Sequence, residues 1–243
     1  MKFKKTATGS IAYCEHTPQD IEVSWFGVDF WREHSAVTGS SKGRYTTWFV
    51  DANKIAATQH QWVLRHYYRG GLIEKISRDQ YFFTGLARTR AVAELALLET
   101  LYQQGLPVPK PIAANVEHSG LRYRADLIIE RVDGAEDLVA RLSKISMTSE
   151  QWQSLGKCIA RFHNHGVYHA DLNAKNILIA AEEFYLIDFD RCDIRTPKAD
   201  WQQSNMDRLL RSFRKELAKL PQLSFTEADW QHLHKAYSGA LTK

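Results

Sequence analysis

The segment HADLNAKNILIAAEEFYLIDFD, residues 169–190, decides the fold of this 243-residue chain. Two apolar runs within it, NILIA and FYLIDF, have the composition of short buried strands. The polar residues Asp171, Asn176 and Asp188 lie at the ends of these runs. Because burying unpaired carboxylates and amides is costly, we expect these side chains either to cap loops or to hold a charged group.

The spacing His-x-Asp-Leu-x-x-x-Asn, followed later by Asp-Phe, matches the catalytic and metal-binding loops of phosphotransferases. Asp171 is the predicted base or orienting group, since a carboxylate accepts the proton of an attacking hydroxyl. Asn176 and Asp188 are the predicted Mg²⁺ ligands, because this cation prefers oxygen ligands. His169 is expected to orient the loop through hydrogen bonds. Asx residues also cap ordinary turns, but the combined pattern favours a catalytic site.

The composition is that of a globular protein, with 44% hydrophobic and 25% charged residues, enough for one large domain or two lobes. The net charge of +4 permits an anionic partner, and no motif supports nucleic-acid binding. The cysteines Cys14, Cys158 and Cys192 show no paired spacing, which predicts a reducing compartment. The chain begins without an apolar signal segment and has no run as long as a membrane span, so we expect a cytoplasmic location.

Hydrophobic periodicity predicts strands in the first half of the chain and helices in the second. The Pro107–Pro111 segment is expected to be extended, because prolines occupy alternate positions. A boundary is predicted near 130–134. We expect a hairpin over 35–50, a strand over 61–71, a helix over 77–104, a strand pair ending near 134, and helices over 136–145, 149–166, 200–217 and 225–241.

Four segments, GSSKGRYTTWF, LRHYYRGG, GLPVPKPIAA and HADLNAKNILI, together resemble the lipopolysaccharide core kinase family. The resemblance spans residues 30–237 and implies an α+β, bilobal, protein-kinase-like fold. The N-terminal lobe, residues 1–131, is expected to hold an antiparallel sheet plus a helix. The C-terminal lobe, residues 132–243, is expected to be mainly helical and to carry the catalytic and metal loops. ATP and Mg²⁺ are the implied cofactors.

The resemblance also implies nucleotide-binding residues in the first lobe. GSSKGRYTT corresponds to the nucleotide-covering loop, where Gly39, Lys42 and Gly43 would lie near phosphates, although a plain hairpin turn is the alternative. Arg65 stands where the fold carries a lysine, and an arginine can hold phosphate bidentately. Glu94 would pair with Arg65, the alternative being a glutamate that faces solvent.

The lobe connection and the catalytic loop supply the other implied residues. Backbone groups from Glu130 to Val132 would bind adenine, and Asp137 would meet the ribose. We predict that Lys175 belongs to the catalytic residues, because a lysine at this position helps to neutralise phosphate charge. An equally good alternative is a solvated loop residue without a catalytic role.

Three positions depart from regulated protein kinases. Ala170, Asn173 and Asp190 stand where those enzymes carry arginine, lysine and glycine. The short segment RCDIRTPKADW leaves little room for an activation loop or a peptide-docking platform, which argues against a protein substrate. The resemblance instead implies ATP-dependent phosphorylation of the 4-hydroxyl of 3-deoxy-D-manno-octulosonic acid (Kdo) attached to lipid A precursor, a step of lipopolysaccharide core biosynthesis.

Basic segments suit an anionic, membrane-embedded acceptor. We expect Arg69, Arg88 and Arg90 to favour the acceptor or the membrane surface, with the protein peripheral on the cytoplasmic face of the inner membrane. The alternatives are a kinase of a heptose or another small-molecule hydroxyl, a nucleotide-binding pseudokinase, and a RIO-like protein kinase. The intact Asp171, Asn176 and Asp188 argue against a pseudokinase.

Overall fold

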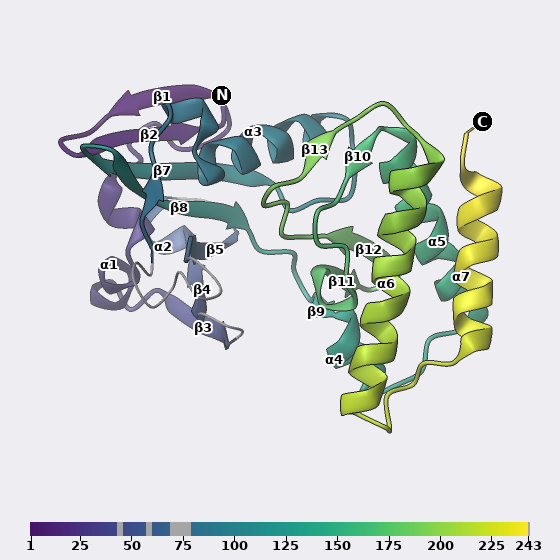
Figure 1. The fold of residues 1–243 in the computed structure, drawn as a ribbon. Helices are drawn as coiled ribbons and strands as arrows, with labels where there is room; N and C mark the ends of the chain where they lie inside the picture. The colour runs from purple at the N-terminus through teal and green to yellow at the C-terminus, as the bar shows by residue number, and fades with distance from the viewer. Residues whose placement is uncertain (43–45, 57–59, 69–78, 243) are drawn as a thin grey trace. The chain divides into compact units, whose positions relative to one another are not determined.

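The computed structural model describes residues 1–42, 46–56, 60–68 and 79–242. Its described part divides into two compact units (Figure 1). The first unit comprises residues 1–103 and 109–131, and the second comprises 104–108 and the chain from 132 onward. The first is built on an antiparallel sheet and the second is mainly helical, which confirms the predicted α+β class.

The first unit is organised by one eight-stranded sheet whose described strand pairs are all antiparallel. The strands follow the order β1-β2-β7-β8-β5-β4-β3, and β6 pairs with β8 beside this path. Their bounds are β1 Lys2–Lys5, β2 Gly9–Tyr13, β3 Val37–Lys42, β4 Thr46–Asp51, β5 Gln61–His66, β6 Tyr81–Phe82, β7 Pro111–Ser119 and β8 Arg122–Glu130. The helices are α1 Val28–Glu33, α2 Asn53–Ala56 and α3 Arg90–Gln103.

Tryptophans fill the core on one side of this sheet. Trp25, Trp31 and Trp62 are buried, with ring centroids 5.8 to 6.4 Å apart. The indole N–H of Trp31 donates to the carbonyl of Trp25 at 2.7 Å, so its polar atom is satisfied inside the core. Each such ring contributes about 2–3 kcal/mol through burial.

Helix α3 begins later than the sequence predicted. The helix expected from Ser77 starts at Arg90, because Tyr81–Phe82 pairs with β8 and Gly85 adopts a φ of 117°. Its buried positions recur at helical spacing and include Glu94, which is 3% exposed. A glutamate on the buried face of α3 needs a partner inside the first unit.

The second unit contains four helices and short strands among the described residues. The helices are α4 Leu138–Leu142, α5 Ser149–Asn164, α6 Ala199–Lys219 and α7 Glu227–Ala240. The strands are β9 Glu136–Asp137, β10 Val167–Tyr168, β11 Ile177–Ala180, β12 Glu183–Leu186 and β13 Asp193–Ile194. The predicted helix over 136–145 is shorter than expected, because Glu136 and Asp137 pair with β11 instead.

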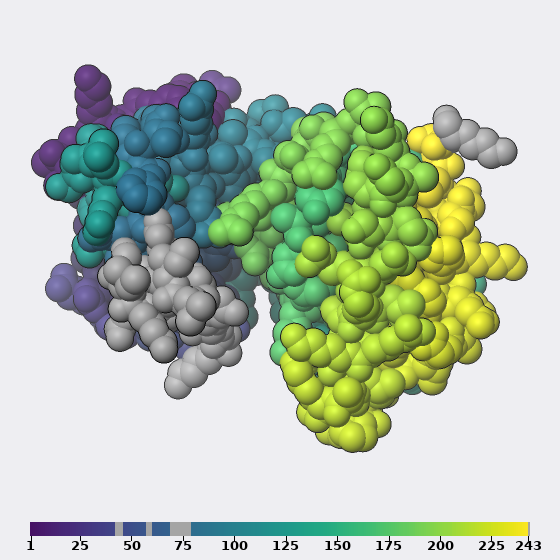
Figure 2. Space-filling model, in the orientation of Figure 1, coloured from purple at the N-terminus to yellow at the C-terminus, as the bar shows by residue number. Residues whose placement is uncertain are grey.

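Local signals explain where the helices begin and how closely they pack. Thr148 before α5 and Thr226 before α7 each form a capping box, which satisfies backbone N–H groups at the helix start. Gly156 lets α5 approach α7, since a Cβ there would lie 2.2 Å from a carbonyl oxygen of α7. Helix α6 forms much of the visible face of this unit in the space-filling view (Figure 2).

Two further properties concern the chain as a whole. The three cysteines are free, with Cys14 buried. Among the helices that the structure describes, none combines the length and the apolar character needed to cross a membrane.

Candidate active site

His169 is locked in place by hydrogen bonds at four points. Its backbone N–H and C=O exchange bonds with the side-chain amide of Asn205, at 3.2 and 3.1 Å. On the ring, Nε2 lies 3.1 Å from the carbonyl of Ile187, and Nδ1 accepts from the backbone N–H of Asp171 at 3.3 Å. Burial lowers the pKa of His169. The neutral ring, protonated on Nε2, satisfies all of these contacts, and the role of His169 in orienting a catalytic loop stays a prediction.

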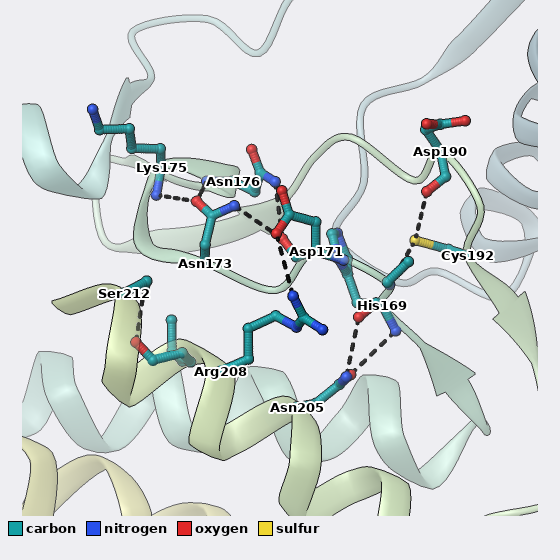
Figure 3. A network of polar contacts seen from close by, with 12 residues as sticks. His169, Asp171, Asn173, Lys175, Asn176, Asp190, Cys192, Asn205, Arg208 and Ser212 are labelled. Carbon is teal, nitrogen blue, oxygen red and sulfur yellow. Dashed lines mark hydrogen bonds and ion pairs between the residues drawn. The ribbon is translucent and has the colours of Figure 1, made fainter. Parts of the chain in front are cut away.

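Asp171 projects from a loop whose main chain is held by two amides (Figure 3). The side chains of Asn173 and Asn176 both donate to its backbone carbonyl, at 3.1 and 3.0 Å. Asn173 also caps the following turn by accepting from the backbone N–H groups of Lys175 and Asn176. The Asp171 carboxylate itself is 63% exposed, so it is accessible to an acceptor.

The hairpin of β11 and β12 brings the two predicted metal ligands to one end. Ile177 pairs with Leu186, and the backbone N–H of Ile187 donates to the carbonyl of Asn176 at 3.0 Å. Asn176 therefore lies opposite Ile187, and Ile187 directly precedes Asp188 in the chain. The two predicted strands are confirmed, and their register places Asn176 and Asp188 at the same end of the hairpin that they form.

Asp188 has an unusual backbone conformation. Its φ of 64° lies in the left-handed region, which costs about 1 kcal/mol for most side chains but is tolerated by aspartate. The next residue, Phe189, is buried between Phe162 and His169, with centroids 6.1 and 5.0 Å away. The packed phenylalanine holds the strained position, and such strain is concentrated at functional sites.

Cys192 connects the metal loop to the catalytic loop. Its thiol accepts from the backbone N–H of Ala170 at 3.2 Å and lies 3.7 Å from the carbonyl of Asp190 (Figure 3). Two of the three positions that depart from regulated protein kinases, Ala170 and Asp190, are thus tied to one side chain.

The donor set fits Mg²⁺ better than a transition metal. The amide nitrogen of Asn176 donates to the backbone carbonyl of Asp171, so its Oδ1 is the atom that would bind a metal together with the Asp188 carboxylate. Across the described residues, no cluster of three His, Cys, Asp or Glu side chains could hold a metal. Mg²⁺ is commonly bound by one or two protein oxygens, with water and phosphate oxygens completing its shell.

Helix α6 braces the catalytic loop through residues that sequence reasoning did not single out. Ser212 accepts from the backbone N–H of Ala174 at 2.9 Å, and Glu216 pairs with Lys175 at 3.4 Å. The Lys175 ammonium is therefore directed toward α6, and its catalytic role stays a prediction. The helix residues that contact the loop recur at helical spacing: Asn205, Arg208, Ser212 and Glu216. That polar stripe was the signal available in the sequence.

In the first unit, the structure contains the ion pair between Arg65 and Glu94 that the family resemblance implied. Tyr67 joins it: the phenol donates to Glu94 and accepts from Arg65 at 2.8 Å, while the guanidinium lies over the ring. Burial raises the pKa of Tyr67 well above its ordinary value. Glu94 is thus no solvent-facing glutamate, and two buried groups, its carboxylate and the Tyr67 phenol, fix the direction of the Arg65 guanidinium.

The predicted nucleotide-covering loop is described only in part. Gly39 lies in β3 beside a register shift, and a Cβ there would meet Phe49 at an ordinary 3.5 Å. Packing within the chain therefore does not require glycine at this position. The backbone of Lys42 pairs with Thr46, and Gly43 lies outside the described residues.

The connection after β8 uses part of its backbone within the first unit. The N–H of Glu130 donates to Lys110 at 2.8 Å, and the N–H of Arg131 donates to Gln61. The carbonyl of Val132 accepts from Ala135 at 3.3 Å. The other backbone N–H and C=O groups from Glu130 to Val132 are the ones that we expect to bind adenine, and this binding stays a prediction.

The side chain of Asp137 caps the N-terminus of helix α4. Its carboxylate accepts from the backbone N–H of Ala140 at 3.0 Å, at the start of α4. This bond engages one carboxylate oxygen. A contact with the ribose stays a prediction.

The chain is also similar to known proteins. Residues 28–237 match the model of the lipopolysaccharide kinase (Kdo/WaaP) family. A 3-deoxy-D-manno-octulosonic acid kinase of Mannheimia succiniciproducens is 46% identical over 88% of this chain and 89% of that protein. The enzyme of the same name from Vibrio parahaemolyticus is 43% identical over 94% and 93%. A solved structure, WaaP in complex with acyl carrier protein, matches with a TM-score of 0.50 at 15% identity over 86% and 82%, which shows the fold alone.

Proposed function

The chain belongs to the lipopolysaccharide kinase (Kdo/WaaP) family, and we propose on this basis that it phosphorylates the 4-hydroxyl of Kdo in a Kdo–lipid A precursor. It is an ATP-dependent sugar kinase of lipopolysaccharide core biosynthesis. The phosphoryl donor is ATP, and the transfer leaves ADP and a phosphorylated sugar acid.

The loop that holds Asp171 supports this proposal most directly. The carboxylate is exposed while its main chain is fixed by Asn173 and Asn176, so the group is both accessible and oriented. Asp171 would accept the proton of the 4-hydroxyl as its oxygen attacks the γ-phosphorus. Positioning of this kind supplies much of the catalysis of phosphoryl transfer.

The metal ligands in this proposal are Asn176 and Asp188. A bound Mg²⁺ would neutralise phosphate charge, and the oxygen donors at the end of the β11–β12 hairpin suit it. His169 keeps the loop in register through the carbonyl of Ile187, the residue before Asp188. Lys175, directed toward α6, supports the loop from outside.

For ATP, the proposed residues of the first unit are Arg65, which contacts phosphate, and Glu94, which orients it through their ion pair. The β3 region adds Gly39, Lys42 and Gly43. The connection adds the backbone from Glu130 to Val132. A bidentate guanidinium differs in geometry from the usual lysine but offers the same charge.

We also propose that the protein works peripherally on the cytoplasmic face of the inner membrane, where a lipid-linked acceptor lies. Phe82 is 69% exposed and pairs across β6 and β8 with exposed Arg122, and Arg88 is exposed nearby in the chain. Arg90 contributes less than expected, because its guanidinium donates to the Tyr81 hydroxyl at 2.8 Å. Arg69 lies outside the described residues.

Vesicle flotation tests this location. Wild-type protein should float with vesicles containing phosphatidylglycerol and stay unbound with neutral phosphatidylcholine vesicles, because arginines attract anionic headgroups. Phe82→Ser combined with Arg122→Gln should lower the bound fraction. Equal flotation of variant and wild type would remove this edge from the membrane surface.

The activity is tested by following Mg-ATP consumption with three acceptors: Kdo–lipid A precursor, the same lipid without Kdo, and a heptose. Turnover only with the first supports the proposal, and mass spectrometry should place one phosphate on Kdo. Turnover with heptose selects the alternative acceptor, and nucleotide binding without turnover selects a pseudokinase.

Asp171→Ala should reduce turnover by about 10²- to 10⁴-fold while the fold persists. The matched control is Asp207→Asn, which removes a carboxylate from the exposed face of α6 and should leave turnover unchanged. Wild-type turnover by the Asp171 variant would refute its role.

A further inference from the structure

Arg208 occupies a central place on the helix face that braces the catalytic loop. It lies three residues after Asn205 and four before Ser212, and both neighbours hold the main chain of the loop. Its guanidinium is the group of α6 that approaches the Asp171 side chain (Figure 3). The helix thus presents one cation beside the carboxylate assigned to the acceptor hydroxyl.

This guanidinium has unused donors. Its Nη1 lies 3.9 Å from Oδ1 of Asp171, an ion pair too long for a direct hydrogen bond. Its Nε is buried and has no hydrogen-bond partner among the residues that the structure describes. A guanidinium offers five N–H groups, and leaving buried ones unpaired costs free energy. Because Nε is buried, an incoming anion would meet the Nη end of this side chain, which is 41% exposed as a whole.

The position of Arg208 assigns that anion to the acceptor and not to the nucleotide. In Figure 3, Asn176 and Arg208 lie on opposite sides of Asp171. Asn176 donates to its backbone carbonyl, and Arg208 faces its carboxylate. Asn176 belongs to the metal and phosphate side of the proposed site. The side reached by Arg208 is therefore left for the molecule whose hydroxyl meets Asp171.

We propose that Arg208 binds the carboxylate of the acceptor sugar acid and so selects a sugar acid over a neutral sugar. This inference rests on the proposed function. In Kdo, two ring bonds separate the carbon bearing the carboxylate from the carbon bearing the 4-hydroxyl, so a residue beside Asp171 reaches both groups. The planar fork of arginine matches a carboxylate, and the Arg208 side chain is 41% exposed.

A purely structural role for Arg208 makes a different prediction. If the guanidinium only positioned Asp171, removing it would slow transfer to every acceptor alike. If it binds the acceptor carboxylate, removing it should matter only when that carboxylate is charged. The charge of the acceptor is therefore the variable to change.

The experiment compares wild type, Arg208→Gln and Arg208→Lys with Kdo–lipid A precursor and with the same acceptor converted to its carboxamide. Arg211→Gln, an exposed arginine on the same helix, is the matched control. Steady-state kcat and KM are measured for acceptor and for ATP, and thermal denaturation verifies that each variant is folded.

With the carboxylate acceptor, Arg208→Gln should raise the acceptor KM about 10- to 100-fold, since a charged hydrogen bond is lost. Arg208→Lys should recover part of the loss, and the KM for ATP should stay unchanged. With the carboxamide acceptor, wild type and Arg208→Gln should perform alike. Equal losses with both acceptors, or no loss with either, would overturn the assignment.

A binding measurement separates this inference from the proposed function. Calorimetric titration with free Kdo needs no turnover: wild type should bind, and Arg208→Gln should bind at least about 10-fold more weakly. Binding that is equal in both proteins overturns the role of Arg208, even when the kinase activity is intact. Absence of turnover in wild type overturns the proposed function, even when Arg208-dependent binding is observed.

Discussion

Asn205 offers the sharpest test of how α6 holds the catalytic loop. Its side chain is 1% exposed and satisfies both backbone groups of His169, at 3.2 and 3.1 Å. Asn205→Ala leaves a buried N–H and a buried C=O without partners. At about 1–3 kcal/mol for each orphaned group, partly relieved by relaxation, the free energy of unfolding should fall by about 2–4 kcal/mol.

The measurement combines stability with local opening. Urea denaturation followed by tryptophan fluorescence gives the loss of stability, and hydrogen exchange over residues 169–176 reports opening of the loop. Exchange there should accelerate more than in α5, and turnover should fall because Asp171 loses its fixed position. Ser204→Ala, an exposed neighbour on the same helix, is the control and should change stability by less than about 0.5 kcal/mol.

One result would refute this reasoning. If Asn205→Ala lost less than about 0.5 kcal/mol and kept its exchange protection, the loop would be held by other contacts and not by this amide.

Three other perturbations test the two units separately. Gly156→Ala places a Cβ 2.2 Å from a carbonyl of α7 and should destabilise the chain by about 1–3 kcal/mol, whereas Gly239→Ala, with no atom within 4 Å, should be neutral or stabilising; equal melting temperatures would contradict this. Tyr67→Phe removes the phenolic hydroxyl that contacts both members of the buried ion pair. It should raise the KM for ATP several-fold, as measured by steady-state turnover at varied ATP concentration. His66 is partly buried, which lowers its pKa, but the Asp126 carboxylate outweighs burial and the pKa is raised from 6.5. His66 therefore stabilises the fold fully below pH 6.5 and loses this contribution as pH rises through its raised pKa. The difference in free energy of unfolding between wild type and His66→Gln should thus become smaller as pH rises, and a difference that stays constant with pH would exclude the effect.

Local sequence patterns predicted most elements, and their failures have physical causes. The β11–β12 hairpin, α5 and α7 follow from apolar runs and capping residues near each other in the chain. The start of α3 was wrong because residues 81–82 are taken by a strand partner some forty positions away. The helix over 136–145 was too long for the same reason, since β11 recruits its first residues.

The chemistry of the site was encoded locally. Asp171, Asn176 and Asp188 could be chosen because residue type and spacing are visible in one segment, and the loop-hairpin geometry brings Asn176 to Asp188's end of the hairpin. Arg65 and Glu94 could be paired only with the help of a family resemblance, because β5 and α3 are separate elements. Tyr67, between them, had no such signal.

What the sequence by itself determined is the α+β class, the strand and helix order, and the residue types that we propose for phosphoryl transfer. Only the tertiary structure decided which groups hold and surround them: Asn205, Arg208, Ser212 and Glu216 meet a loop about thirty to forty positions earlier in the chain. Periodicity tells which face of α6 is polar, because it depends on neighbours along one helix. It does not tell what that face contacts, because packing of distant segments is set by the whole core.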